Sequence, residues 1–304
     1  MARRHVLVLG GTGFVGRHLV ERLLRERCRI TVLSRGVEPA KKRLLSRDAS
    51  LIEGDVGNPD FLRAVLDDVD AVVNLVGILN ERGDSGAGFE HVFVELLDAL
   101  IEAMRDMGVQ RLLQMSALNA GTGQSHYLES RGRAEQRVRA SKLDWTLFRP
   151  SVIAGPGDGL FCRFDQLLRY APALPIGRAG ARFQPVWIGD VVQAFANALN
   201  DDQHIGRSYN LVGPDVLTLG EIVRATARAR GRLRLVLPLP DALGKLQAEV
   251  GEHLPGKPIS RDNWRSLQTD STSVENGLLK LGVEPTPVLP KLPEILGLAP
   301  VAAA

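Results

Sequence analysis

The chain has 304 residues, of which 44% are hydrophobic and 24% charged, a composition typical of a folded globular protein and not of a disordered one. The formal net charge of +3 is slight for this length, and no sequence motif indicates a nucleic-acid partner. The longest apolar run, Ala71 to Leu79, is too short to cross a bilayer, which needs about 20 apolar residues. We therefore expect no transmembrane segment and at most a peripheral membrane contact.

The two cysteines, Cys28 and Cys162, lie far apart and lack the spacing of metal ligands. We expect no disulfide, no metal site and a reducing compartment, the cytoplasm or the inner face of a membrane.

The first strand runs directly into a glycine-rich turn. An apolar run at residues 5–9 is followed by Gly10-Gly11-Thr12-Gly13-Phe14-Val15-Gly16 and then by apolar residues at helical spacing. Glycine is needed where the backbone turns sharply, where it approaches a pyrophosphate, and where the helix lies tightly on the sheet. The anion binds to the free N–H groups at the helix start. The pattern favours a dinucleotide site over a bare structural turn, with cofactor contacts from Gly10, Thr12, Gly13, Phe14, Val15 and Gly16.

Strands and helices then alternate along the chain. Further strands are expected at residues 30–33, 51–52, 71–76, 111–115 and 145–148. Helices are expected after the glycine turn and over residues 59–66, 89–104 and 127–140, where Asn58-Pro59 opens one helix and Gly108 closes another. Six strands with crossover helices predict an α/β protein with a Rossmann doubly wound parallel sheet.

Beyond Pro150 the regular alternation breaks down and prolines become frequent. We assign residues 1–154 to the NAD(P)-binding domain. Residues 184–200 read as a strand and a helix that return to this domain. The segments 155–183 and 201–304 are expected to form a smaller, interleaved C-terminal lobe for a substrate or partner.

The end of the second strand indicates which dinucleotide is bound. NAD-binding versions of this fold place an acidic side chain there for the ribose 2′-hydroxyl, whereas this chain has Ser34 and Arg35. Arginine suits a 2′-phosphate, and Lys41, Lys42 and Arg43 follow closely. NADP(H) is therefore favoured, with NAD(H) as the alternative. An ordinary solvated turn would also account for these cations.

Several motifs in chain order together resemble one family. They are the glycine run, Gly54-Asp55-Val56, Asn74-Leu75-Val76-Gly77, the helix that begins near Tyr127, residues 144–151 and residues 185–191. Over residues 5 to 220 the chain resembles the extended short-chain dehydrogenase/reductases, an epimerase- and dehydratase-like group. Residues 73–79, 115–118 and 127–131 look like the atypical branch that contains the dehydrogenase-like accessory subunit of respiratory complex I and its bacterial relatives.

The resemblance implies further cofactor contacts. Asp55 and Val56 would contact the adenine, Leu75, Val76 and Gly77 the ribose and nicotinamide side, and Pro150 to Val152 would close over the nicotinamide. The local sequence alone favours an ordinary capping or turn residue at Asp55 and plain core packing for Leu75 and Val76.

Active members of this family use a tyrosine as general acid and base, a lysine four residues later, and a hydroxyl residue that orients the carbonyl. The resemblance places Tyr127, Arg131 and Ser116 in these positions, where they also count as cofactor contacts. Arginine keeps a positive charge beside the phenol, but it does not transfer protons readily and hydrogen-bonds as a flat fork. Beyond Ser116, Ala117 and Leu118 stand where active relatives more often place the hydroxyl.

Three roles stay open for Tyr127: catalysis, a ribose contact without turnover, and packing on the helix surface. The histidines His91 and His126 have no partner at metal or triad spacing.

Two functions follow from this departure. One is an NADP(H)-binding protein whose nucleotide is structural or regulatory, serving as an accessory or assembly factor of a larger respiratory-type complex. The other is a working NADP-dependent oxidoreductase or epimerase that acts on a hydrophobic, quinone-like or lipid-like carbonyl or alcohol.

Overall fold

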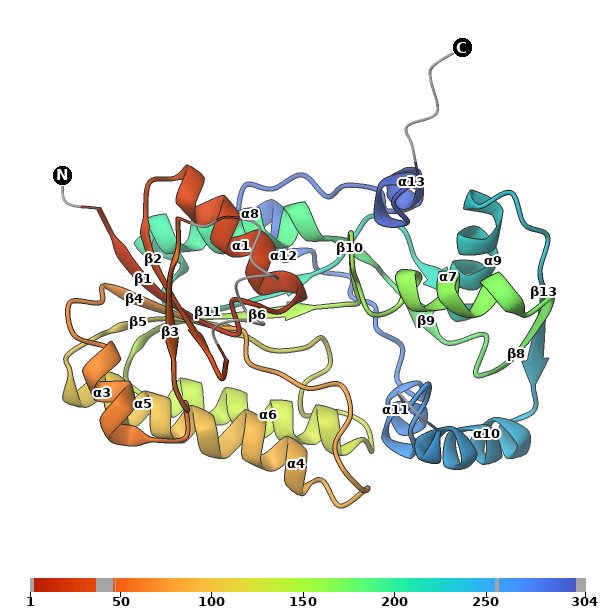
Figure 1. Ribbon diagram of the computed structural model, residues 1–304, viewed down its shortest axis with the longest axis horizontal. Helices are drawn as coiled ribbons and strands as arrows, with labels where there is room; N and C mark the ends of the chain where they lie inside the picture. The colour runs from red at the N-terminus through yellow and green to blue at the C-terminus, as the bar shows by residue number, and fades with distance from the viewer. Residues whose placement is uncertain (1–2, 37–45, 47, 255–256, 299–304) are drawn as a thin grey trace, which may run out of the picture.

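The computed structural model describes residues 3–36, 46, 48–254 and 257–298 (Figure 1). Its centre is a parallel sheet of seven strands. Across the sheet they are β11 (Arg207–Leu211), β6 (Asp144–Pro150), β5 (Arg111–Met115), β4 (Ala71–Asn74), β1 (His5–Leu9), β2 (Arg29–Ser34) and β3 (Ser50–Glu53). The strand order reverses between β1 and β4, which is where doubly wound sheets bind their ligands. The predicted Rossmann architecture is confirmed.

The sheet is buried on both faces because its central strands are apolar throughout. In β1, Val6 and Val8 belong to one core cluster, whereas Leu7 and Leu9 belong to the other. This alternation follows from the two-residue repeat of a strand. Each face of the sheet therefore needs its own layer of helices.

Two sets of helices supply these layers (Figure 1). One face is covered by α1 (Phe14–Arg25), α8 (Ile188–Asn200) and α12 (Gly277–Lys280). The other is covered by α3 (Pro59–Val65), α4 (Ala87–Glu90), α5 (Leu96–Asp106) and α6 (His126–Ala140).

The helix expected over residues 89–104 is interrupted. A π-helical turn, η1 (His91–Glu95), joins α4 to α5. Such a turn inserts one extra residue without breaking the apolar stripe, so spacing by threes and fours does not reveal it. The turn carries Phe93, which packs in the candidate site.

The seventh strand is a correction to the sequence analysis. The sequence places residues 207–211 in the smaller lobe, but β11 pairs with β6 at the edge of the central sheet. An edge strand has one neighbour, and this one buries Tyr209 and Leu211 between polar residues, so no continuous apolar run marks it.

The second lobe is built from short ribbons and helices. Three strand pairs are present: β7 (Ile153–Ala154) with β10 (Val186–Trp187), β9 (Arg182–Phe183) with β12 (Leu217–Thr218), and β8 (Ala173–Gly177) with β13 (Leu235–Leu239). The helical elements are α7 (Phe161–Tyr170), α9 (Leu219–Ala229), α10 (Asp241–His253), α11 (Arg261–Ser266), η3 (Leu289–Lys291) and α13 (Leu292–Ile295), whereas η2 (Asp202–His204) lies against α8 and β6 of the central sheet.

The segment expected to return to the sheet does so only in part. Helix α8 packs against α1 over the central sheet, but β10 pairs with β7 and not with a strand of that sheet. No helix among the described residues combines the length and apolarity needed to span a membrane.

Candidate functional site

The glycine turn connects β1 to α1 in a conformation that side chains would obstruct. Gly10 has a φ of +75°, and the N–H of Gly13 donates to its carbonyl at 3.0 Å. A Cβ on Gly16 would lie 2.2 Å from the Gly10 carbonyl oxygen. The helix start therefore lies directly against the turn, with Thr12, Phe14 and Val15 half-buried around it.

The loop after β4 meets this turn. The N–H of Leu75 donates to the Leu9 carbonyl at 3.0 Å, and a Cβ on Gly10 would lie 2.9 Å from the Leu75 carbonyl carbon. The N–H of Val76 donates to the Asn74 side chain at 3.1 Å. Val76 and Val56 line one small cavity together. Residues predicted to contact opposite ends of one dinucleotide thus lie along one edge of the sheet.

At the end of β2, the described residues are Ser34, Arg35 and Gly36, and none of these three is acidic. Arg35 is exposed and makes no hydrogen bond or ion pair with another described residue. The Ser34 hydroxyl donates to the Gly36 carbonyl at 3.1 Å. Lys41, Lys42 and Arg43 lie outside the described residues.

Asp55 is exposed, and its carboxylate accepts the N–H of Gly57 at 2.9 Å. Within the described structure it acts as a turn residue, and its predicted adenine contact stays a prediction.

Tyr127 lies in the first turn of α6, which Ser125 caps by accepting the N–H of Leu128 at 3.1 Å. Its ring meets Phe89 and Phe93 edge-to-face, at centroid distances of 5.8 and 5.6 Å. The Tyr127 hydroxyl makes no hydrogen bond with a described residue and is not buried. It is therefore available to a ligand.

Arg131 lies one turn further along α6 and is buried. Its Nη1 donates to the Met115 carbonyl at 3.0 Å, and its guanidinium carbon lies 3.8 Å from the centre of the Phe93 ring. The same carbon lies 5.5 Å from the centre of the Tyr127 ring, over the ring face. Its Nε is buried without a partner. These contacts fix the orientation of the Arg131 side chain more firmly than a flexible lysine side chain would be fixed.

Gly77 leaves room for this arginine. A Cβ at that position would lie 2.9 Å from the Arg131 Nη2. The guanidinium therefore approaches the loop predicted to face the ribose and nicotinamide.

Ser116 follows β5 and points into a buried polar cluster. Its hydroxyl donates to Glu135 at 2.7 Å, and Glu135 also accepts the Nε of Arg149 at 2.7 Å. This hydrogen bond raises the pKa of the Arg149 guanidinium. Because the Ser116 proton is already donated, the geometry does not favour the predicted catalytic role. The neighbouring Ala117 and Leu118 are buried and carry no hydroxyl.

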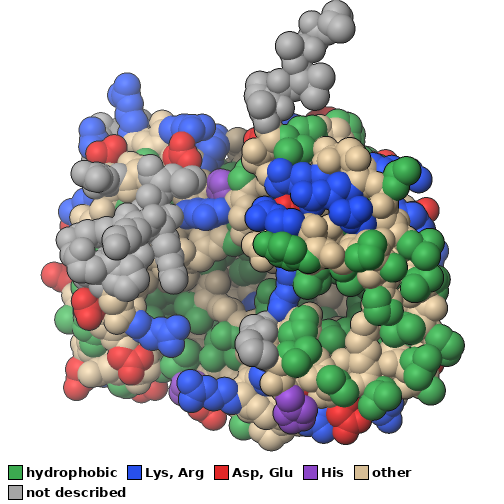
Figure 2. All heavy atoms as spheres, turned by 45° about the vertical axis from the view of Figure 1, so that its right-hand side comes forward, with side chains coloured by type: hydrophobic (Ala, Val, Ile, Leu, Met, Phe, Trp, Pro, Cys, Tyr) green, Lys and Arg blue, Asp and Glu red, His purple; other side chains and the backbone are tan. Residues whose placement is uncertain are grey.

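Pro150 and Val152 lie at the same edge of the sheet. The Pro150 carbonyl accepts the N–H of Leu118 at 2.9 Å, and the Val152 carbonyl accepts the N–H of Val186 at 3.0 Å. Figure 2 shows a hollow between the sheet and the second lobe, lined in part by hydrophobic side chains. Pro150 and Val152, which are predicted to close over the nicotinamide, therefore lie where the chain passes from the sheet to the second lobe.

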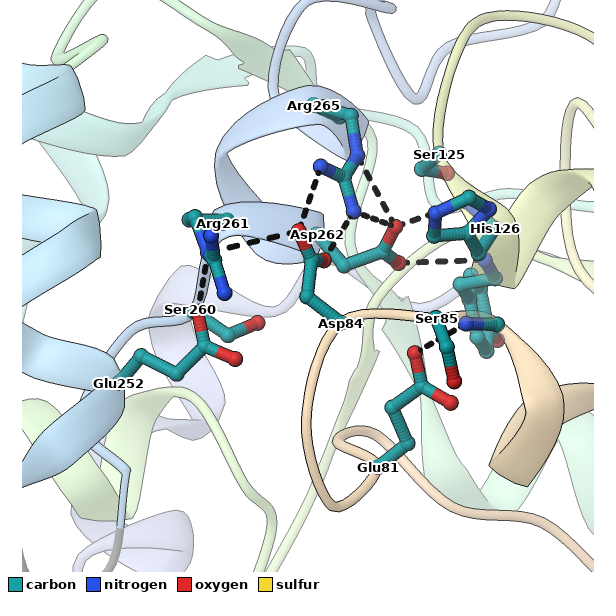
Figure 3. A network of polar contacts seen from close by, with 12 residues as sticks. Glu81, Asp84, Ser85, Ser125, His126, Glu252, Ser260, Arg261, Asp262 and Arg265 are labelled. Carbon is teal, nitrogen blue, oxygen red and sulfur yellow. Dashed lines mark hydrogen bonds and ion pairs between the residues drawn. The ribbon is translucent and has the colours of Figure 1, made fainter.

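Sequence reasoning missed a polar cluster beside Tyr127, which we call the α11 cluster and define as Asp84, Arg261, Asp262 and Arg265 (Figure 3). Asp262 accepts the main-chain N–H groups of His126 at 2.7 Å and of Tyr127 at 3.1 Å. Arg265 contacts the carboxylates of both Asp84 and Asp262. The members come from distant parts of the chain, so no local pattern joins them.

The carboxylates of Asp84 and Asp262 and the ring of His126 lie within 4.8 Å of one another, a grouping that resembles a metal site. Arg265 already occupies the position of a cation between the two carboxylates, and Arg261 lies 3.4 Å from Asp84. The hydrogen bond from Arg265 lowers the pKa of Asp84. These contacts describe an ion-pair cluster that joins the second lobe to α6.

The comparisons with known proteins agree with this geometry. The family model described as NAD(P)H-binding matches residues 10–161. The mitochondrial NADH dehydrogenase (ubiquinone) 1 alpha subcomplex subunit 9 of Arabidopsis thaliana is 32% identical over 288 residues, which cover 89% of this chain and 71% of that protein. The chain belongs to the extended short-chain dehydrogenase/reductases.

Two further comparisons show a related sequence and a related fold. The ceramide reductase of Caulobacter vibrioides is 28% identical over 240 residues, covering 79% of this chain and 75% of that protein. The UDP-glucuronic acid 4-epimerase of Bacillus cereus shares the fold, with a TM-score of 0.76 at 18% identity over 96% of this chain and 98% of that one. As a short-chain dehydrogenase/reductase, this chain binds a nicotinamide dinucleotide, and Gly10 and Gly16 let the turn, the loop after β4 and the start of α1 approach one another closely.

Proposed function

We propose that this protein binds NADP(H) chiefly as a structural or regulatory element and serves as an accessory or assembly factor of a respiratory-type complex. The observation that carries the proposal is a contrast between two parts of the site. The glycine turn after β1 has the form that binds a nucleotide, whereas two of the three predicted reactive side chains already make hydrogen bonds within the protein. The Ser116 hydroxyl donates to Glu135, and Arg131 donates to the Met115 carbonyl. The related subunit of mitochondrial NADH dehydrogenase supports an accessory role.

A bound nucleotide would stabilise such a protein by mass action, because only the folded chain has the cradle. Residues from β1, β4 and α6 would bind one ligand together. Loss of the ligand is therefore expected to loosen the carboxyl edge of the sheet.

The preference for NADP(H) rests on Arg35. Its guanidinium is exposed and unpaired among the described residues, at the strand end where the adenosine ribose lies in this fold. A hydrogen bond between the Arg35 guanidinium and the 2′-phosphate would contribute to the free energy of NADPH binding. Arg35→Ala should therefore weaken NADPH binding about tenfold or more and leave NADH binding unchanged. Titration calorimetry with both nucleotides tests this. The control variant is Arg207→Ala, because Arg207 is also exposed but lies at the start of β11, on the far edge of the sheet from β2. Equal affinities for NADPH and NADH would contradict the preference.

The accessory role has its own experiment. Freshly purified protein is denatured and the released nucleotide is identified by mass, while the native protein is assayed with NADPH and a panel of carbonyl compounds. The proposal expects bound nucleotide, no turnover, and co-purification with a large complex. Tyr127→Phe should then retain the nucleotide. Turnover that depends on Tyr127 would overturn the structural role.

A second function is favoured by one observation, the Tyr127 hydroxyl that faces no described hydrogen-bond partner. In an NADPH-dependent reductase, the nicotinamide would supply a hydride to the carbonyl carbon. Tyr127 would donate its phenolic proton to the carbonyl oxygen, and the nearby Arg131 charge would favour the resulting phenolate. The similarity to a ceramide reductase supports a lipid-like substrate. Complete loss of turnover in Tyr127→Phe, with NADPH affinity retained, is the expected result for this function.

A further inference from the structure

Helix α10 carries an apolar stripe that no described part of the protein covers. Leu243, Leu246, Val250 and Leu254 follow helical spacing along one side, and each exposes half or more of its surface. The adjoining side of the helix is buried, with Gly244 and Ala248 turned toward the lobe. The stripe is therefore distinct from the face that holds α10 in place.

Strand β13 continues this apolar surface. Val236 packs into the lobe core, whereas Leu235 and Leu237 point the other way and are exposed. Leu233, just before the strand, is 90% exposed. Near the start of β13, Tyr170 at the end of α7 is 83% exposed, and the Leu235 N–H donates to the Pro172 carbonyl at 3.1 Å.

Hydrogen bonds connect the two elements that carry these apolar side chains. The Gln247 side chain of α10 donates to the Pro175 carbonyl at 2.8 Å, and Pro175 pairs with Leu237 across the β8–β13 ribbon. We call the exposed side chains of 233–237 and of α10 the apolar face. Figure 2 shows hydrophobic side chains gathered over this right-hand part of the molecule, with a compact group of Lys and Arg side chains above them.

The elements beside the apolar face are strongly basic. Residues 161–170 and 219–239 contain seven arginines against the two acids Asp165 and Glu221. Arg169 and Arg228 are exposed, and Asp165 is buried against Arg230. On α10, Asp241 pairs with Arg178 and Glu252 with Arg261. The charge beside residues 233–237 is thus positive, whereas α10 itself exposes both Lys245 and Glu249.

We propose that the apolar face docks on the surface of an anionic phospholipid bilayer. Leucine and tyrosine side chains that lie in the interface, flanked by arginines that meet lipid phosphates, are the chemistry of proteins that rest on a membrane without spanning it. Proteins that act alone in water rarely expose a contiguous apolar patch of this kind. The arginines distinguish this occupant from a second copy of the chain, which would bring the same positive charge to the contact.

Sedimentation with vesicles tests the proposal on the full chain. Wild-type protein should bind vesicles of phosphatidylcholine mixed with phosphatidylglycerol, bind phosphatidylcholine alone more weakly, and lose affinity as salt increases. The double variant Leu246→Gln with Val250→Gln should bind the anionic vesicles at least about tenfold more weakly, because apolar burial at the interface is removed. Both positions are exposed, so the thermal midpoint should not change.

A matched control uses exposed apolar residues away from this face. Val274 and Leu279 are both exposed, and Val274→Gln with Leu279→Gln should bind vesicles as the wild type does. The proposal is overturned if wild-type protein ignores anionic vesicles at low salt, or if the α10 variant binds them unchanged. A dimer in sedimentation equilibrium that the α10 variant abolishes, together with no vesicle binding, would also overturn it and assign the face to a second copy.

Discussion

The carboxylate of Asp262 accepts the main-chain N–H of Tyr127 at 3.1 Å, so a residue of α11 caps the helix that carries the candidate catalytic tyrosine. The first N–H groups of a helix have no partner within it and form its positive end, which a carboxylate satisfies well. Asp262 is buried and also pairs with Arg265. The second lobe therefore determines how α6 begins.

Replacing this cap should cost stability. Asp262→Ala leaves the N–H groups of His126 and Tyr127 without their acceptor and leaves Arg265 with Asp84 alone, and we expect a loss of about 1–3 kcal/mol in the free energy of unfolding. Urea unfolding measures it. The exposed pair of Glu294 with Lys291 gives the control, Glu294→Ala, which should change stability by about 0.5 kcal/mol at most. Equal stability of both variants would contradict the capping role.

Two glycines of the turn should fail in different ways. A Cβ on Gly16 meets the Gly10 carbonyl at 2.2 Å, so Gly16→Ala should lower stability by about 1–3 kcal/mol. Gly13 is exposed and its added Cβ meets only the Gly10 carbonyl, at 3.2 Å. Gly13→Ala should fold like the wild type but bind NADPH more weakly, as calorimetry and thermal unfolding together would show. A Gly13→Ala protein with full NADPH affinity would mean that the main chain there does not approach the phosphates.

The buried cluster around Glu135 should be sensitive to truncation. Glu135→Ala leaves the Arg149 guanidinium and the Ser116 hydroxyl without their acceptor, and removing one partner of a buried pair destabilises by about 3 kcal/mol. Glu129→Ala is a matched control, because Glu129 pairs with Arg133 at the surface of the same helix. It should lose about 1 kcal/mol at most. Chemical denaturation of both variants distinguishes the two sites.

The α11 cluster predicts a dependence of stability on pH. Arg265 holds the folded-state pKa of Asp84 below its usual value of 3.8, so the unfolded chain binds more protons as the pH falls through that value. The contribution of Asp84 is thus present above pH 3.8 and lost below it. Asp84→Asn should lower the thermal midpoint near pH 6, and the difference from wild type should shrink as the pH falls below 3.8. A difference that stays constant at acid pH would show that the charge of Asp84 contributes nothing.

The parts of the fold that could be predicted are those with a local cause. The glycine turn, the apolar strands and the stripe of α5 each follow from neighbouring residues, and all are present. The strand β11 could not be predicted, because an edge position tolerates its alternating polar residues. The turn η1 was hidden by an unbroken apolar stripe.

The candidate site shows the same division. The family resemblance predicts roles for Tyr127 and Arg131, and their spacing of four residues on a helix brings both side chains to one face. It could not show that Phe93 would hold the guanidinium or that Glu135 would take the Ser116 proton, because both contacts depend on packing between distant elements. The same is true of Asp84 and Asp262, which are 178 positions apart by their residue numbers and meet through Arg265.

The return of the chain to the central sheet at β11 has a mechanical consequence. The polypeptide leaves the sheet after β6, comes back as α8 and β11, leaves again for α9, and returns once more as α12. Rotating one half as a rigid body would bend all of these crossings simultaneously, unlike hinged proteins, in which a few residues absorb the motion. Entry and exit of ligands should therefore proceed through rearranged side chains and short loops at the rim, while the scaffold stays stiff.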